Sequence, residues 1–438
     1  MYKVLLIGEG GREAAIAKSL HESGAKLYSF MSFKNAGIAR ISEKFYIGSL
    51  LDFESAYKFA KENNVDFAIS GPEAPLVHGI ADYFEDRGIP FVGPRREVAM
   101  IEGSKSFARE LMRKYKINAY PEFKIALSLE ECEKAIEEIK DYVIKPDGLT
   151  GGKGVKVLGE HFFNKEEAIK YCEQILPLHK KIVIEERVEG EEFVLQCFYD
   201  GKTLVPMPLV QDHKRALDDD KGENTGGMGS ISHKSHLLPF ISEAVLDRSL
   251  RILKETMLAL EKEKGLKYKG IIYGQFMLTR KGPLIIEYNV RFGDPEAINV
   301  LSLLRSNFLE ICYDIIEGNL SEKKIDFEKL STVCVYLVPR GYPSNPMKDM
   351  IVEVQEDKIK ELGVELYYAS LKEVGNKLYT TGSRSLALLA KSEEIQEASK
   401  LCYKATAYVK GELFYRRDIG TEKLINKRIE NLKRLGIL

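Results

Sequence analysis

The stretch IIEYNVRFGDPE at residues 285–296 begins as an apolar run and then alternates polar with apolar residues. Side chains on a strand point alternately to its two sides, so a strand here would place Glu287, Asn289 and Arg291 on one face. Carboxylate and amide oxygens are ligands of hard divalent cations, and a guanidinium can hold a carboxylate or a phosphoryl group. The stretch therefore predicts Mg²⁺-nucleotide chemistry, and a strand with a solvated polar face is the alternative.

Length and composition restrict the class of protein. The chain has 438 residues, enough for about two to four domains. Its 65 lysines and arginines nearly balance its 66 aspartates and glutamates, so the net charge suggests neither a nucleic-acid partner nor an acidic tail. The six cysteines are scattered and no secretory signal precedes the first apolar run, which predicts reduced thiols in a cytoplasmic protein. No apolar stretch approaches the roughly 20 residues that span a bilayer, so no membrane association is expected.

The first part of the chain alternates strand-like with helix-like segments. Strands are expected at 3–7, 26–32, 65–70 and 89–92, and helices at 14–23, 52–63 and 76–87. This alternation predicts a parallel, doubly wound sheet over about the first 95 residues. Apolar residues at helical spacing from Ser104 to Tyr115, followed by Pro121, indicate a domain boundary near residue 104.

Beyond residue 120 the pattern is mixed. Strands are expected at 142–145, 182–186, 193–199, 203–210, 271–279, 284–289, 332–338 and 384–390, and helices at 165–175, 242–264 and 297–317. Residues 211–232 are rich in glycine and polar side chains, which predicts a long loop. From about residue 330 the chain is expected to form a separate mixed α/β domain.

The first of two glycine clusters departs from the dinucleotide-binding fingerprint. The cluster from Gly8 ends in Glu13 where that motif needs glycine, and Lys34 stands near the place of the expected ribose-binding acid. A nicotinamide cofactor is therefore disfavoured. The backbone amides of Gly10 and Gly11 at a helix N-terminus could still receive a phosphate, and a tight strand-to-helix turn is the alternative.

The second glycine cluster, residues 148–154, follows Lys145. It is not a P-loop, because Gly154 follows Gly152-Lys153 where that motif has serine or threonine. One interpretation is a phosphate lid, in which backbone amides close over a polyphosphate and Lys145 supplies a point charge. The other interpretation is a flexible hairpin.

Two further polar segments are candidates for binding. The segment IEERVEGEE at 184–192 ends a strand and turns, so its carboxylates could accept from an adenine amino group or a ribose hydroxyl, or could form a solvated acidic loop. The segment from QDHKR at 211–215 to NTGGMG at 224–229 could close over a small substrate. His233 and His236 have the spacing of metal ligands, but no third ligand is nearby, so a zinc site is not expected.

Ten strings, taken in order, carry a resemblance to a known family. They are GEGGRE at 8–13, NAG at 35–37, SGPEAPLVHGI at 70–80, EGSKSFA at 102–108, IKPDGLTGGKGV at 144–155, IEERVEGEE at 184–192, QDHKR at 211–215, NTGGMG at 224–229, EYNVRFGDPE at 287–296 and RRDIG at 416–420. Over essentially its whole length the chain resembles the phosphoribosylamine–glycine ligase family, also called glycinamide ribonucleotide synthetases, within the ATP-grasp superfamily. QDHKR, NTGGMG and RFGDPE in this order are the most specific of the matches.

The resemblance implies a fold and an activity. The expected fold is α/β: an ATP-grasp domain at 104–329 with a lid subdomain at about 121–190, an N-terminal doubly wound parallel-sheet domain at 1–103, and a small C-terminal mixed α/β domain at 330–438. The expected activity is ATP-dependent ligation of glycine to 5-phosphoribosylamine through a glycyl phosphate. The products would be glycinamide ribonucleotide, ADP and phosphate, in purine biosynthesis. A cytoplasmic monomer without nucleic-acid or membrane partners is expected.

The resemblance also implies roles for single residues. Phosphoryl transfer would depend on Arg291 and Lys145. ATP would be bound by Lys105, Lys145, Gly151, Gly152, Glu185, Val188 and Glu192. Mg²⁺, or Mn²⁺, would be held by Gln275, Glu287 and Asn289. Glycine and phosphoribosylamine would be bound by Gly10, Gly11, Asn35, Glu73, Asp212, Lys214 and Asp294.

Two departures from the family pattern lie in the expected phosphoribosylamine site. Ala14 stands where histidine usually follows GGRE, and Phe33-Lys34 replace the proline and glycine that usually precede NAG. The alternative functions are another ATP-grasp carboxylate–amine ligase or carboxylase, and a catalytically silent ATP-binding regulator. A dehydrogenase is disfavoured by Glu13 and Lys34.

Overall fold

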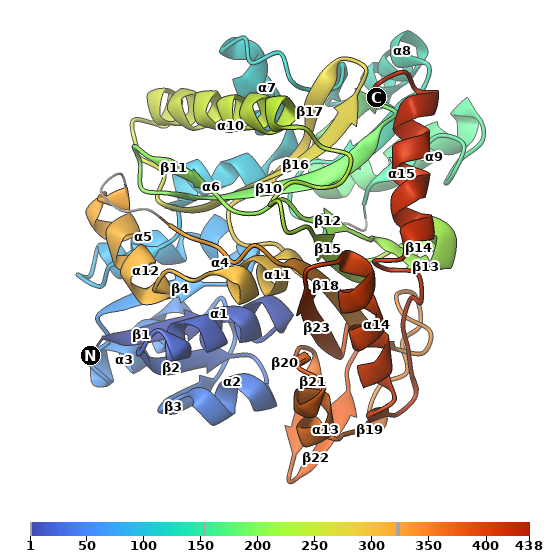
Figure 1. The fold of residues 1–438 in the computed structure, drawn as a ribbon. Helices are drawn as coiled ribbons and strands as arrows, with labels where there is room; N and C mark the ends of the chain where they lie inside the picture. The colour runs from blue at the N-terminus through green and yellow to red at the C-terminus, as the bar shows by residue number, and fades with distance from the viewer. Residues whose placement is uncertain (1, 152–153, 321–324) are drawn as a thin grey trace.

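The computed structural model describes residues 2–151, 154–320 and 325–438 and shows a mixed α/β protein (Figure 1). Gly152, one of the residues expected to bind ATP, lies outside these ranges. The sheets follow one another roughly in chain order, and each carries helices packed against it.

The N-terminal sheet is parallel and has the strand order β3-β2-β1-β4-β5, which confirms the expected doubly wound arrangement. Its strands are β1 (Lys3–Ile7), β2 (Lys26–Met31), β3 (Lys44–Ile47), β4 (Phe67–Ser70) and β5 (Phe91–Val92). The helices of this part of the chain are α1 (Gly11–Glu22), α2 (Ala36–Ile41), α3 (Phe53–Glu62), α4 (Glu73–Val77), α5 (Ile80–Glu85), α6 (Arg96–Gly103) and α7 (Lys105–Lys114). Parallel sheets are usually covered on both faces, and β1 is accordingly buried from Val4 to Ile7. The edge strand β3 is exposed along its length and is not anticipated by the sequence.

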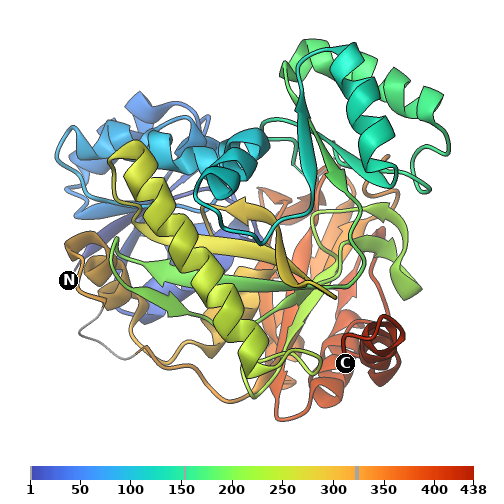
Figure 2. The ribbon, with the colours of Figure 1, turned by 90° about the horizontal axis from the view of Figure 1, so that it is seen from above.

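A lid, defined here as residues 123–186, stands apart from the rest of the molecule (teal to green in Figure 2). Its antiparallel sheet has the order β6-β9-β7-β8. Its elements are β6 (Phe123–Ala126), α8 (Leu129–Ile139), β7 (Tyr142–Pro146), β8 (Lys156–Val157), α9 (Lys165–His179) and β9 (Ile182–Glu186). The lid has a hydrophobic core of its own, separate from the core of the rest of the protein, so it is an independent packing unit.

The central antiparallel sheet carries the stretch at 285–296. Its order is β11-β10-β16-β17, with β10 (Glu191–Tyr199), β11 (Leu204–Pro206), β16 (Gly270–Thr279) and β17 (Gly282–Asn289). The long helix α10 (Glu243–Lys264) lies across this sheet (Figure 2). The predicted strand is therefore confirmed as β17. Gln275 of β16 is paired with Glu287 of β17, which places polar side chains of two strands side by side.

The C-terminal sheet takes in strands from the segment that was expected to be a loop. Its order is β12-β15-β18-β23-β20, and β25 pairs with β18. Its strands are β12 (Gln211–Asp212), β15 (Gly229–Ser232), β18 (Ser331–Pro339), β20 (Glu365–Tyr368), β23 (Leu386–Ser392) and β25 (Leu413–Phe414). Between β12 and β15, a separate ribbon is formed by β13 (Arg215–Leu217) and β14 (Lys221–Asn224), joined by the 3₁₀ turn Asp218–Asp220. The loop prediction for 211–232 was wrong because strands this short have no readable period and β15 pairs with the distant β18.

The remaining elements complete the central and C-terminal parts. They are α11 (Glu296–Leu303), α12 (Phe308–Glu317), β19 (Ile351–Val354), α13 (Glu356–Glu361), β21 (Leu371–Val374), β22 (Lys377–Thr380), α14 (Ile395–Thr406), β24 (Val409–Lys410) and α15 (Glu422–Arg434). Two expected helices are each divided. The helix expected at 297–317 is interrupted before Asn307, whose side chain accepts from the amide of Glu310 at 3.0 Å and so starts α12. The helix expected at 76–87 is divided at Gly79, whose φ of +93° is accessible to glycine.

One hydrophobic core joins the N-terminal, central and C-terminal sheets. All six cysteines are buried and free, as expected for packed thiols. Within the described ranges, no helix combines the length and the apolar character needed to cross a membrane.

Candidate active site

A cavity of about 1190 Å³ is lined by the lid, the central sheet and the C-terminal part of the chain, and it adjoins a smaller one of about 130 Å³. Lys145, Glu287 and Arg291 line both. The expected site residues that line at least one of the two are Glu73, Lys105, Lys145, Gly151, Glu185, Val188, Glu192, Asp212, Lys214, Gln275, Glu287, Asn289, Arg291 and Asp294. The fold therefore gathers candidates separated by more than half of the chain.

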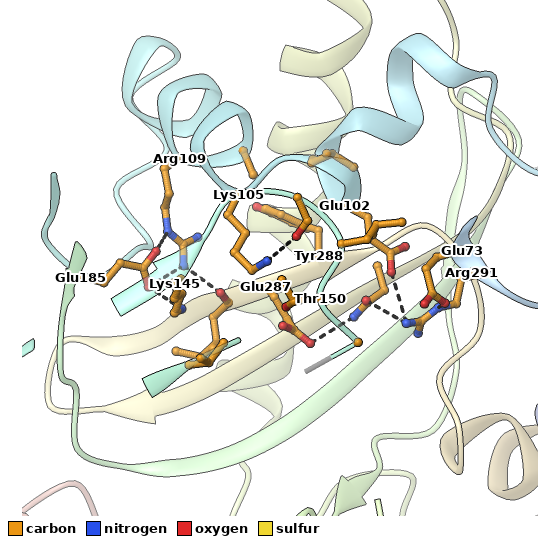
Figure 3. A pocket seen from close by; sticks show the side chains of 18 residues that line it. Glu73, Glu102, Lys105, Arg109, Lys145, Thr150, Glu185, Glu287, Tyr288 and Arg291 are labelled. Atoms are coloured by element: carbon orange, nitrogen blue, oxygen red, sulfur yellow. Dashed lines mark hydrogen bonds and ion pairs between the residues drawn. The ribbon is translucent and has the colours of Figure 1, made fainter. Parts of the chain in front are cut away.

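Three buried charged side chains meet at one end of the smaller cavity (Figure 3). Lys145 of β7 donates to one oxygen of Glu185 at 2.5 Å, and Arg109 of α7 donates to the other at 2.6 Å. None of the three residues is more than 6% exposed. Burial alone would raise the pKa of Glu185, but the charges of Arg109 and Lys145 lower it to about 2. Glu185 is therefore ionised and has both oxygens bound to cations.

Lys105 reaches the same cavity from the first turn of α7. Its ammonium donates to the carbonyl oxygen of Gly148 at 2.7 Å, and burial lowers its pKa. Asp147 holds this turn, because its carboxylate accepts from the hydroxyl of Ser106 at 2.7 Å and from that of Ser104 at 2.9 Å. The N-terminus of α7 thus anchors the beginning of the glycine loop.

The polar ends of β16 and β17 face the cavity. Asn289 Nδ2 lies 3.5 Å from Glu287 Oε1, and Gln275 Oε1 accepts from Lys214 at 2.6 Å. Burial alone would raise the pKa of Glu287, but the charges of Lys214 and Lys105 lower it. Glu287 is therefore ionised.

The polar ends of β16 and β17 combine one carboxylate, from Glu287, with side-chain amides. Among the residues that the structure describes, no group of three or more His, Cys, Asp or Glu side chains could hold a metal by itself. Mg²⁺ is commonly bound by only one or two carboxylates, with substrate phosphates and water as the other ligands. One carboxylate from Glu287 and an amide oxygen from Asn289 fit that mode of binding better than a cage made wholly of protein.

Arg291 is held by two acidic side chains, Glu73 and Glu102, at the other end of the smaller cavity (Figure 3), and burial raises the pKa of Glu102 to about 7. Its Nε lies 3.2 Å from Glu73 Oε2, and its Nη2 lies 3.2 Å from Glu102 Oε1 and donates to Asn289 Oδ1 at 3.1 Å. Burial alone would raise the pKa of Glu73, but the charges of Arg291 and Arg12 lower it to about 2. The guanidinium is thus fixed beside the Glu287 and Asn289 side chains.

Two carboxyl groups, Asp212 and Glu296, lie in the part of the larger cavity formed by β12 and the start of α11. Burial raises the pKa of Asp212 well above its ordinary value, and the charge of Glu296 adds to this effect. Burial also raises the pKa of Glu296. Oδ1 of Asp212 is buried and has no hydrogen-bond partner in the part of the chain that the structure describes. Because neighbouring carboxyl groups do not readily both ionise, this end of the cavity suits a substrate with an ammonium or amine group.

Three expected substrate residues do not line either cavity and instead pack between parts of the fold. They are Gly10, Gly11 and Asn35. Asn35 caps α2, and its amide nitrogen donates to the carbonyl oxygen of Tyr368 at 2.9 Å. A Cβ atom at Gly11 would stand 1.9 Å from the hydroxyl oxygen of Tyr336, so glycine there permits close contact between α1 and β18.

The sequence analysis assigns no role to several charged residues that line the cavities. Among them are Glu102, Arg109, Glu296 and Arg384. Arg109 follows Lys105 by four positions on α7, and this spacing could have indicated a shared helix face. Glu296 ends the RFGDPE string and could have been included with it. Arg384 carries no local signal, because its partners come from other parts of the chain.

Comparison with protein families gives three consecutive matches. The N domain of phosphoribosylglycinamide synthetase matches residues 2–102, the ATP-grasp (A) domain matches residues 103–297, and the C domain matches residues 332–422.

Individual proteins match over almost the whole chain. The phosphoribosylamine–glycine ligase of Pyrococcus furiosus is 49% identical over 436 residues, which cover 99% of this chain and 98% of that protein. The enzyme of the same name from Methanocaldococcus jannaschii is 46% identical over 442 residues, 99% of each. The crystal structure of phosphoribosylamine–glycine ligase from Thermotoga maritima is similar with a TM-score of 0.81 at 31% identity, and it covers 95% of this chain and 99% of that chain.

Proposed function

The chain belongs to the phosphoribosylglycinamide synthetase family, and from this membership we propose how its cavity performs the reaction. The protein is an ATP-dependent ligase that joins glycine to 5-phosphoribosylamine in purine biosynthesis. This assignment agrees with the resemblance seen in the sequence.

We infer that the lid end of the cavity binds ATP. Lys105 and Lys145 present separate ammonium groups, which suits a polyphosphate. Because both oxygens of Glu185 are bound by Arg109 and Lys145, we assign Glu185 to positioning Lys145 rather than to contact with adenine. The remaining candidates for contact with ATP are Gly151, Gly152, Val188 and Glu192.

We propose that Mg²⁺, or Mn²⁺ in its place, binds at Glu287 and Asn289. These two side chains would hold the ion beside the phosphates, where it would supply positive charge that offsets theirs during transfer. Gln275 is the remaining candidate ligand. Its amide oxygen accepts from Lys214 at 2.6 Å, as that of Asn289 accepts from Arg291 at 3.1 Å.

We propose that the chemistry has two steps. The carboxylate of glycine attacks the γ-phosphorus of ATP, which forms glycyl phosphate and releases ADP. The amine of phosphoribosylamine then attacks the acyl carbon, displaces phosphate, loses a proton and forms the amide. Arg291 stabilises the phosphoryl group in transfer, and no protein nucleophile is needed because positioning and charge carry most of the catalysis. Glu73 acts through Arg291. Asp212 and Lys214 are the candidates for direct contact with glycine and the amine.

The observation that carries this proposal is the convergence of Lys145, Glu287 and Arg291 in one cavity. The test is a coupled assay with ATP, Mg²⁺, glycine, and phosphoribosylamine formed in situ from ribose 5-phosphate and ammonia. ADP formation is expected to require both glycine and the amine. ADP release that is indifferent to glycine would overturn the assignment.

We further propose a cytoplasmic monomer with three domains, at 1–103, 104–329 and 330–438. The balanced charge and the buried free cysteines support this proposal. Sedimentation equilibrium is expected to give the mass of one chain, 49.6 kDa. A mass close to twice that value would contradict the monomer.

A further inference from the structure

Arg384, between β22 and β23, brings a side chain of the C-terminal part of the protein to the larger cavity. Its Nη1 donates to the backbone carbonyl oxygens of Gly226 at 2.6 Å, Gly227 at 3.1 Å and Asp294 at 2.9 Å. Its Nη2 lies 3.1 Å from Oδ2 of Asp294, and its guanidinium lies 4.4 Å from the ring centre of Tyr336. The side chain is only 13% exposed. Four oxygen acceptors and an aromatic face therefore surround one guanidinium.

Asp294 is held by three parts of the molecule. Its Oδ1 accepts from the hydroxyl of Tyr336 on β18 at 2.6 Å. Its Oδ2 faces Arg384 and also accepts from the backbone amide of Arg12 on α1 at 3.5 Å. Because both oxygens are bound by protein donors, Asp294 links the N-terminal and C-terminal parts at the cavity rather than offering a free carboxylate to a substrate.

Two of the three carbonyl groups that Arg384 holds, those of Gly226 and Gly227, belong to the loop before β15, which lies against Asp212. Gly227 has a φ of +112°, and a Cβ atom there would lie 2.6 Å from Oδ1 of Asp212 and 2.7 Å from Cδ of Pro295. The loop therefore lies in close contact with the Asp212 carboxyl group. A shift of the loop would change the orientation of that carboxyl group.

We propose that Arg384 is a positioning residue for the end of the cavity that contains Asp212 and Lys214. It holds the Gly226–Gly227 loop and Asp294 in the geometry in which Asp212 and Lys214 contact glycine and phosphoribosylamine. This inference rests on the proposed function of the same cavity. The planar guanidinium donates to several acceptors at fixed angles, whereas an ammonium group is a single point charge. The C-terminal part of the chain thus takes part in substrate binding through one side chain that acts on others.

The first experiment separates the substrates in steady-state kinetics. In Arg384→Ala, the KM values for glycine and phosphoribosylamine are expected to rise by about tenfold or more, because small displacements of positioned groups are costly. The KM for ATP is expected to change by less than about twofold, because Arg384 contacts none of the lysines at the ATP end. The matched control is Arg340→Ala, an arginine of the same part of the chain that is 66% exposed and paired with Glu412 at 3.1 Å; it is expected to leave all three KM values unchanged. Equal rises for all three substrates in Arg384→Ala, or no rise, would overturn the inference.

The second experiment is chemical rescue. Arg384→Ala leaves a space lined by three carbonyl oxygens, a carboxylate and a ring, which fits free guanidinium. Guanidinium chloride at millimolar concentration is expected to lower the raised KM values again, whereas equal concentrations of sodium chloride or methylammonium chloride are not. A general structural defect would not be repaired by a denaturant. Failure of guanidinium to restore binding would overturn the inference.

A milder variant keeps the inference testable if Arg384→Ala does not fold. Tyr336→Phe removes the hydroxyl donor to Asp294 and keeps the ring beneath the guanidinium. It is expected to raise the KM for glycine or the amine by about threefold or more, with the KM for ATP unchanged. No change in any KM would overturn the inference. An inactive wild type would instead contradict the proposed function, whereas an active wild type with unaffected variants would contradict only the positioning by Arg384.

Discussion

At the scale of single residues, the site depends on buried charges that neutralise one another. Glu185 lies between Arg109 and Lys145, and Arg291 lies between Glu73 and Glu102. A buried charge that loses its partner is strongly destabilising, because burial removes the water that would otherwise solvate it. Each of these residues therefore affects both the stability of the fold and the charge of the cavity.

Glu185→Gln is expected to lower the free energy of unfolding by about 3 kcal/mol at pH 7, because one pKa unit corresponds to about 1.4 kcal/mol and the pKa of Glu185 is lowered from 4.5 to about 2. A carboxyl group with a lowered pKa stabilises the fold above its unfolded pKa, and this stabilisation is lost as the pH falls. The difference in the free energy of unfolding between wild type and variant should thus be largest above pH 4.5 and should decrease toward pH 2. Urea unfolding at several pH values measures it.

Glu186→Gln is the matched control, since Glu186 pairs with the exposed Lys281 at 3.2 Å. An exposed ion pair contributes little, so this variant is expected to differ from wild type by no more than about 0.5 kcal/mol. A pH-independent loss of stability in Glu185→Gln would contradict the proposed origin of the effect.

Arg291→Ala is expected to lower kcat by about 10²- to 10³-fold, because it removes a preorganised donor to the transferring phosphoryl group. Steady-state ADP formation in the presence of glycine and the amine measures the change. Arg113→Ala, which alters a 61% exposed arginine of α7, is the control and should leave kcat unchanged. A decrease of less than about threefold in Arg291→Ala would remove this residue from the mechanism.

At the scale of elements, close approach of segments is made possible by glycines at particular positions. Gly11 lets α1 approach Tyr336 of β18, and Gly227 lets the loop before β15 approach Asp212 of β12. Side chains at these positions would overlap atoms that line or support the cavity. Close packing of these elements thus requires the lack of a side chain at these positions as well as apolar contacts.

Gly227→Ala is expected to raise the KM for glycine by about tenfold or more, because its Cβ atom would displace the Asp212 carboxyl group and strain a backbone with a φ of +112°. Gly265→Ala is the matched control: Gly265 also has a positive φ, +67°, but a Cβ atom there meets nothing within 4 Å. The control variant has the backbone strain but not the overlap. Its free energy of unfolding should therefore fall while its KM for glycine stays unchanged. Equal KM values for glycine in both variants would show that the overlap is unimportant, contrary to this expectation.

At the scale of the whole molecule, the described residues form two packing units. The lid has a small core of its own, whereas the N-terminal, central and C-terminal sheets share a much larger one. A small core buries a smaller fraction of its surface and is less stable by itself. Opening of the lid therefore does not require disruption of the main core.

Amide hydrogen exchange is expected to show this division. The amides of β7 and β9 in the lid should exchange through openings of lower free energy than those of β1 and β10, which belong to the shared core. MgATP should slow exchange in the lid more than in β1, because Lys145 and Glu185 of the lid line the cavity. Equal protection of the lid and the main core, with or without MgATP, would show that they open as one unit.

Prediction from the sequence succeeded where one segment contains its own signal. The strand β17, the helix α10 and the parallel N-terminal sheet follow from runs of apolar residues with a single period. It failed at β12 and β15, which are too short to show a period and are stabilised by pairing with each other and with β18. The break between α11 and α12 was missed because a polar N-cap inside an otherwise helical pattern is a weak signal.

The sequence by itself determined the family and the reaction, because Lys105, Lys145, Glu287 and Arg291 lie in strings whose type and order are specific. Most of its candidate site residues also line the two cavities. Only the tertiary structure decided what the side chains contact. Glu185 meets Arg109 from 76 positions away, and Arg384 meets Asp294 from 90 positions away. Such partners are set by packing of distant segments rather than by local sequence, and they are the basis on which we propose positioning roles for Glu185 and Asp294.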